Sequence, residues 1–148
     1  MITDYALWFN TYGTPQAETS IGQYDSNNVY DMTVVDKNII TNGYLVFQIV
    51  VAITAATETL QIDLVCSAAA ALTTPTILWG TGVLATATIE AWEANSIVYV
   101  VKIPPNIPLR YLGMSYTIAA DDFDTGSWNC FITPNAPQFI AADPTATS

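Results

Sequence analysis

The stretch Ile97–Ala119, IVYVVKIPPNIPLRYLGMSYTIA, shows the clearest strand pattern in the chain. Successive residues of a strand point to opposite faces. One face of the second half carries Leu112, Met114, Tyr116 and Ile118, and the other carries Tyr111, Gly113, Ser115 and Thr117. A proline-rich turn at residues 104–108 separates two such segments, which predicts a hairpin. A hairpin cannot bury its apolar face alone, so we expect the rest of the chain to supply a covering sheet.

The length of the turn sets the expected register of this hairpin. If Ile103 pairs with Leu109, then Lys102 lies opposite Arg110 and Val100 faces Leu112. Like charges placed opposite each other repel unless an anion lies between them. A carboxylate of the same chain would satisfy them, and so would an acidic group of a partner, which Arg can bind in a bidentate way.

The remaining chain contains short apolar segments separated by turn residues. Strands are expected around 20–24, 29–35, 44–53, 59–67, 76–79, 97–103, 109–119 and 127–133, with one helical turn within 88–95. The pattern of seven or eight strands predicts an all-β fold, an antiparallel β-sandwich of jelly-roll type. We expect one domain over 1–148, with its core at about 20–133. An aromatic N-terminal segment (1–19) and a Pro/Ala/Thr-rich arm (134–148) would extend from it.

The composition of the 148 residues indicates a chain that packs into an assembly. Hydrophobic residues make up 51%, which predicts a packed core, whereas charged residues make up only 11%. Soluble domains usually have roughly 25% charged residues. The surface must therefore be built largely from uncharged side chains. Such a surface is more typical of a subunit that contacts other subunits than of a soluble monomer.

The charge balance disfavours several partners. Thirteen acids against three bases give a formal net charge of −10. Phosphate contacts need many Lys and Arg side chains, so Lys37, Lys102 and Arg110 do not predict binding to nucleic acid or to an anionic membrane. The longest apolar run, Tyr44–Ala56, is too short for a membrane-spanning helix. The N-terminus lacks the basic residues of a secretory signal.

The chain offers few residues for catalysis or metal binding. It has no histidine, which removes the commonest general base and the usual triads, and no cofactor is expected. Cys66 and Cys130 lie in apolar strands and are expected to be buried free thiols rather than a disulfide. Asp121, Asp122 and Asp124 form the one carboxylate cluster and match a calcium loop in two positions only. A hydrolase built on two facing carboxylates remains a distant alternative.

Four tryptophans raise the possibility of sugar binding. Trp128 alternates with Cys130 and Ile132, which favours a place in the core. Trp79 and Trp92 lie at the ends of expected elements, where an exposed ring can stack on a sugar. A carbohydrate-binding sandwich is therefore the main alternative function.

The N-terminal segment MITDYALWFNTY is unusually aromatic for a chain end. It packs either on its own domain or on a neighbouring subunit, and we favour the neighbour; the sandwich should then fold without residues 1–12. Ten residues are candidates for contact with a partner or within an oligomer. They are Tyr5, Leu7, Trp8, Phe9, Tyr12, Trp79, Trp92, Lys102, Arg110 and Phe139.

The order of segments between Tyr44 and Thr133 resembles that of a known family. AITAATETLQIDLVCS (52–67) leads to LTTPTIL (72–78), a helical turn and a strand that closes on Ile103-Pro104. Arg110-Tyr111-Leu112, Met114–Ile118, a glycine and a last strand follow. In this order the chain is similar to the jelly-roll capsid cement, or decoration, proteins of tailed bacteriophages. The stretch Pro104–Tyr116 is the most specific part, while the N-terminal segment and the C-terminal arm do not align.

The resemblance implies a structural role without catalysis. Such a protein would lie on the outer surface of the virion capsid, after synthesis in the host cytoplasm. Its partners would be the major capsid protein and further copies of itself, as a homodimer or homotrimer. Docking would keep the apolar and aromatic surface out of water.

Overall fold

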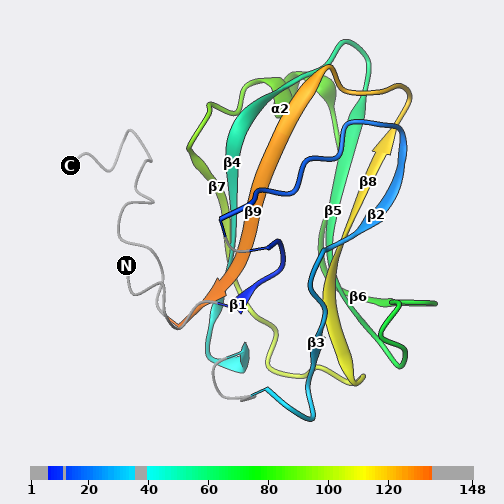
Figure 1. Cartoon of the computed structure of the whole chain (residues 1–148), viewed down its shortest axis with the longest axis vertical. Coiled ribbons are helices and arrows are strands. Elements are labelled where there is room, and N and C mark those ends of the chain that lie inside the picture. Colours follow the sequence, from blue (N-terminus) through cyan, green and yellow to red (C-terminus); the bar gives the residue numbers. More distant parts are fainter. Residues whose placement is uncertain (1–6, 12, 36–39, 135–148) are drawn as a thin grey trace.

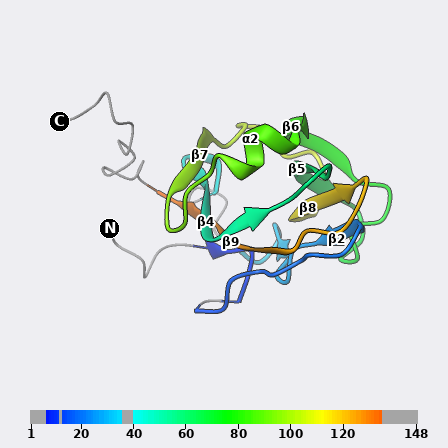
Figure 2. The same ribbon diagram turned by 90° about the horizontal axis from the view of Figure 1, so that it is seen from above.

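The computed structural model describes residues 7–11, 13–35 and 40–134, which form two antiparallel sheets packed face to face. Figure 1 shows the two layers from the side, and Figure 2 shows from above that they face each other. The expected all-β sandwich is confirmed. The candidate contacts Tyr5, Tyr12 and Phe139 lie outside the described residues.

The first sheet has four strands in the order β1-β9-β4-β7. These are β1 (Leu7–Trp8), β9 (Thr125–Thr133), β4 (Tyr44–Thr54) and β7 (Ile97–Lys102). β4 is the most hydrophobic segment of the chain, and β9 pairs along nearly its whole length. The last strand in sequence therefore lies inside its sheet, between the first strand and β4.

The second sheet has five strands, with β2, β8, β5 and β6 in that order and β3 also paired to β8. These are β2 (Gly22–Asp25), β3 (Tyr30–Asp31), β5 (Thr59–Ser67), β6 (Thr76–Leu84) and β8 (Tyr111–Ala119). β5 and β8 pair without a register shift from Thr59↔Ala119 to Ser67↔Tyr111. They form the regular centre to which the irregular β6 is added as an edge strand.

The expected hairpin within 97–119 is wrong. β7 pairs with β4 and β8 pairs with β2, β3 and β5, so the proline-rich turn crosses from one sheet to the other. Val100 lies opposite Val46, and Leu112 lies opposite Cys66 and Tyr30. The alternation identified both strands and the inward face of β8 correctly. It carried no information about the sheet that each strand joins.

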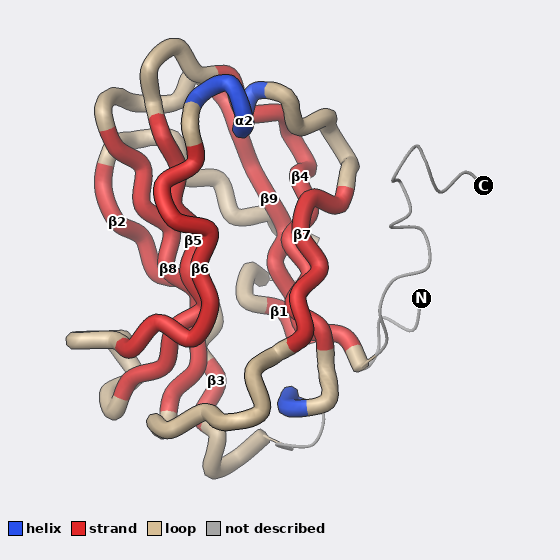
Figure 3. Tube along the Cα trace, turned by 180° about the vertical axis from the view of Figure 1, so that it is seen from behind, coloured by secondary structure: helices blue, strands red, loops and turns tan. Residues whose placement is uncertain are grey.

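Three other elements differ from expectation. The strand expected at 29–35 is reduced to β3, and the backbone turns over residues 32–34. The strand expected at 76–79 continues to Leu84, because Gly80-Thr81-Gly82 lies within β6 rather than after it. The helical turn expected within 88–95 is α2 (Thr86–Glu90), which begins two residues earlier and is preceded by Ala85 without a side-chain cap. In Figures 2 and 3 α2 lies between the edge strands β6 and β7.

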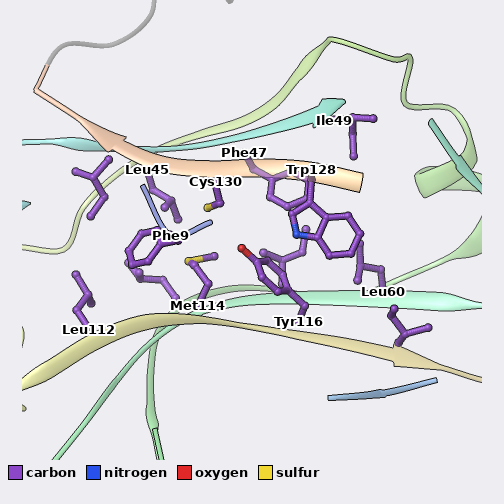
Figure 4. Close-up of a cluster of buried hydrophobic side chains, with 14 of the residues drawn as sticks. Phe9, Leu45, Phe47, Ile49, Leu60, Leu112, Met114, Tyr116, Trp128 and Cys130 are labelled. Carbon is purple, nitrogen blue, oxygen red and sulfur yellow. The ribbon is translucent and has the colours of Figure 1, made fainter. Parts of the chain in front are cut away.

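The core lies between the two sheets and is rich in aromatic residues (Figure 4). Phe47, Tyr116 and Trp128 are fully buried, and the ring centroids of Tyr116 and Trp128 lie 5.2 Å apart in an edge-to-face arrangement. Trp128 is thus a core residue, as its alternation predicted. Rings packed in this way contribute more than their buried area alone.

Candidate partner-binding surface

The open side of the sandwich between β6 and β7 is closed by three half-buried aromatic residues, here called the seam: Trp79, Trp92 and Tyr99. The ring of Tyr99 lies 5.6 Å from that of Trp79 and 5.9 Å from that of Trp92, both edge to face. Phe47 supports the seam from the core, 6.0 Å from Trp92. The structure therefore brings together two of the candidate contacts through a third ring.

Beside the seam, the outer face of β6 carries exposed apolar side chains. Ile77 is 56% exposed and Val83 is 68% exposed, two of the five large hydrophobic residues that are exposed in the described part of the chain. They pair with Val65 and Gln61 of β5, on the face away from the core. Gly80 lies between them and pairs with Asp63. We call Ile77, Gly80, Val83 and Asp63 the ledge.

Two register shifts bring the three β6 residues of the ledge onto one face. β6 uses one residue more than β5 between Ile77 and Trp79, and one more between Gly80 and Val83. The second irregularity includes Gly82, whose φ of +68° is easily adopted by glycine. Bulges of this kind twist an edge strand and oppose its pairing with a further strand. Contact at β6 is thus directed to its face rather than to its free edge.

Asp63 is the one acidic residue of the ledge, and it is only 6% exposed. Its Oδ2 accepts a hydrogen bond of 3.0 Å from Gln61 Nε2, and its Oδ1 lies so close to Gly80 that a Cβ there would collide with it. Burial raises the pKa of Asp63, and the bond from Gln61 opposes this shift. Asp63 lies beside Ser115 of β8, which has Asp25 of β2 on its other side.

The described part of the N-terminal segment packs on its own domain. Leu7 and Trp8 pair with Ile132 and Phe131, and the rings of Trp8 and Phe131 lie 4.5 Å apart. Phe9 is fully buried in the core, so the expectation that it contacts a partner is wrong. Deletion of residues 1–12 would remove this core side chain, so we expect it to destabilise the sandwich rather than leave its folding unchanged.

The cations Lys102 and Arg110 do not face each other, because β7, which ends at Lys102, and β8, which begins directly after Arg110, belong to different sheets. Arg110 forms a bidentate ion pair with Asp31, with Nε–Oδ1 and Nη2–Oδ2 distances of 3.0 and 2.8 Å. Hydrogen bonds from Arg110 and Thr33 hold the pKa of Asp31 well below its usual value. Lys102 donates to the carbonyl of Thr41 and lies 5.1 Å from the ring centroid of Tyr44. Both cations thus have partners within the chain.

The remaining candidates for chemistry are not gathered into a site. Among the described residues, no group of three or more His, Cys, Asp and Glu side chains is placed to hold a metal ion. Asp122 accepts a hydrogen bond from the backbone of Ile21. Glu58 accepts backbone N–H groups of Ala56 and Thr57, which makes it a turn residue.

The two cysteines are buried free thiols, as expected. Burial raises the pKa of Cys130 to about 12, and the neighbouring Tyr116 hydroxyl lowers it only in part. A thiol with so high a pKa is protonated at neutral pH and is a poor nucleophile.

Sequence reasoning missed Tyr99, Ile77, Val83 and Asp63 as parts of this surface. The expected hairpin would place Tyr99 away from both tryptophans. The strand expected at 76–79 ends at Trp79, before Val83. The one available signal is charge, because no Asp, Glu, Lys or Arg occurs between Asp63 and Glu90.

Comparison with protein-family models finds no match for this chain, and comparison with curated proteins finds no similar sequence. Within the described residues, no helix has the length and apolar character needed to cross a bilayer.

Proposed function

We propose that this chain is a non-enzymatic structural virion protein, a cement protein that docks on the outer surface of a tailed-phage capsid. The observation that carries the proposal is the combination of the ledge on the outer face of β6 and the seam along the open side of the sandwich. Strand β6, which contributes to both, lies in a stretch without Asp, Glu, Lys or Arg from Leu64 to Ile89. Exposed apolar and aromatic side chains gathered in this way are typical of surfaces that bind other proteins.

The strand order supports the same proposal. In a jelly roll two Greek keys wrap two four-stranded sheets around each other. With β2 and β3 counted as one interrupted strand, the observed orders β1-β9-β4-β7 and β2-β8-β5-β6 correspond to that arrangement. We infer a jelly roll on this basis, which agrees with the family that the segment order resembles.

If the chain docks on a capsid shell, modest contacts per copy are enough to stabilise the shell. A protein that binds assembled subunits and not free ones stabilises the assembly by mass action. Many copies act on one lattice, so each interface can be small. The net charge of −10 would limit adhesion between decorated particles.

Immunogold labelling tests the proposal on particles from the source of the sequence. Antibodies raised against the recombinant chain should label the outside of intact heads, and cryo-imaging should place the sandwich over contacts between major capsid subunits. Labelling restricted to tails, or an absence of the chain from purified particles, would contradict the proposal.

The seam also favours a second candidate, a carbohydrate-binding module displayed on a virion. Trp79, Trp92 and Tyr99 are half-buried rings, of the kind on which sugars stack. Titration of the chain with a glycan panel should quench tryptophan fluorescence if sugars bind at the seam. Quenching that is lost in Trp92→Ala would favour this candidate, whereas an unresponsive spectrum would exclude it for the sugars tested.

A further inference from the structure

The ledge has a chemistry that limits what can cover it. Ile77 and Val83 present apolar side chains on either side of Gly80, and the Asp63 carboxylate lies against Gly80. An occupant must therefore bury apolar surface around a carboxylate that is already largely removed from water. Transfer of a charge out of water is costly unless an opposite charge accompanies it.

A second copy of this chain meets this requirement poorly. A twofold contact centred on Gly80 would bring Ile77 against Val83 of the other copy, which is favourable. The same contact would place two Asp63 carboxylates close together in a dry interface. Like charges in such a position repel strongly. The bulges of β6 also oppose the alternative of edge-to-edge strand pairing.

The chain itself supplies no cation to Asp63 within its described part. Arg110 is held by Asp31, and Lys102 by Thr41 and the Tyr44 ring. No described residue donates a hydrogen bond to Asp63 Oδ1, whereas Oδ2 accepts one from Gln61. Asp25, across Ser115 on the same face, adds a second negative charge to the surroundings. The raised pKa of Asp63 agrees with a carboxylate that lacks a cationic neighbour.

We infer that the ledge is the face that docks on another protein, and that the partner presents a Lys or Arg side chain, flanked by apolar residues, to Asp63. The inference rests on the proposed function for the identity of that partner, the capsid subunit. The apolar stem of the Lys or Arg would lie along Ile77 and Val83, while its charged head would reach Asp63 at Gly80. Charge complementarity thus selects the partner, and the apolar contacts stabilise the complex.

A pair of matched peptides tests the chemistry without a capsid. The probes are acetyl-Leu-Lys-Leu-amide and acetyl-Leu-Gln-Leu-amide, titrated into the full-length ¹⁵N-labelled chain. We expect the lysine peptide to shift the amide signals of Asp63, Gly80 and Ser115, with an affinity about tenfold above that of the glutamine peptide. High salt should reduce the difference. Shifts that are equal for both peptides, or that occur elsewhere on the chain, would overturn the inference.

Two variants test whether the preference for the lysine peptide depends on Asp63. Asp63→Asn should abolish the preference for lysine, whereas Asp124→Asn, an equal change of net charge at an exposed turn, should leave it intact. A preference that survives in Asp63→Asn overturns the inference. Signals of the ledge that shift with protein concentration alone would instead show a second copy there, and would overturn it as well.

Binding to purified heads separates this inference from the proposed function. If the lysine preference is found but the chain does not bind heads, the ledge is supported as a site for a basic side chain, and the proposed function fails. If the chain binds heads and Asp63→Asn binds them equally well, the proposed function stands and the ledge as its docking face fails. If Asp63→Asn weakens head binding about tenfold and Asp124→Asn does not, both stand.

Discussion

β9 and β6 are strands of equal length and similar apolar content, yet the fold uses them in opposite ways. β9 lies inside its sheet between β1 and β4, and most of its residues are buried on both faces. β6 lies at an edge, none of its residues is fully buried, and Ile77 and Val83 are largely exposed. The apolar side chains of β9 therefore pack in the interior, whereas those of Ile77 and Val83 in β6 face the solvent. We therefore propose that β9 serves the fold and that β6 serves recognition.

The largest expected effect comes from a change in β9. Trp128→Ala should lower the free energy of unfolding by about 3–5 kcal/mol, because it leaves a large cavity against Phe47 and Tyr116. Trp79→Ala, in half-buried β6, should cost clearly less. Urea denaturation followed by far-UV circular dichroism measures both. Equal losses would show that β6 is as important to the core as β9.

A glycine in each strand sharpens the comparison. Gly126 of β9 has a φ of +154°, and a Cβ there would lie 2.9 Å from Ile53 Cγ1. Gly126→Ala should therefore cost about 1–3 kcal/mol. Gly80→Ala in β6 meets only the end of the Asp63 side chain, which can rotate away. Gly80→Ala should therefore lower the free energy of unfolding less than Gly126→Ala does. It should nevertheless change the lysine preference of the ledge. Thermal denaturation of both variants distinguishes these outcomes.

Polar substitutions on the ledge should separate recognition from stability. The double change Ile77→Thr and Val83→Thr alters two exposed residues and should change the free energy of unfolding by less than about 1 kcal/mol in total. It should weaken head binding about tenfold or more. Val51→Thr, at an exposed apolar position of β4, is the matched control and should bind normally. Pelleting assays with purified heads measure the difference, and unchanged binding of the double variant would count against the ledge.

The smallest expected effect concerns pH. Because burial raises the pKa of Asp63 in the folded chain, its ionisation opposes folding. The contribution of Asp63 to stability is therefore greatest below the unfolded pKa and declines as pH rises through the higher folded pKa. Asp63→Asn should remove this decline and make the chain slightly more stable at neutral pH. Urea titrations at pH 3.5–7 measure the effect, and a variant that is less stable at pH 7 would contradict it.

The contrast between β5 and β7 shows how much of the fold local pattern can predict. β5 begins and ends at the predicted residues, and the inward face of β8 is as predicted, because alternation against a half-covered sheet is a local property. The partner of β7 is not local. A five-residue proline-rich turn closes a hairpin or crosses between sheets equally well. The pairing of Phe47 with Tyr99 depends on the whole core.

The candidate surface was predictable only in part for a similar reason. Trp79 and Trp92 are identified from the sequence as rings at the ends of elements, where they could be exposed; both are half-buried, and Trp79 lies within β6 rather than at its end. Ile77 and Val83 share a face only because two bulges break the regular alternation. Phe9 followed an aromatic pattern that suits a core as well as an interface. Its burial is decided by the space that Tyr30 and its neighbours leave between the sheets.

The interior position of β9 has a consequence for the way in which the chain acquires its structure. β5 and β6 are the one pair of consecutive described strands that hydrogen-bond to each other; the other pairings join distant parts of the sequence. Loop closure of this kind makes folding slow compared with that of helical domains. Strands β1 and β4 leave the ribosome long before the strand that must lie between them. Until residues 125–133 emerge, β1 has no strand to pair with and β4 can pair only with β7, so one edge of β4 stays open to chaperones in that interval.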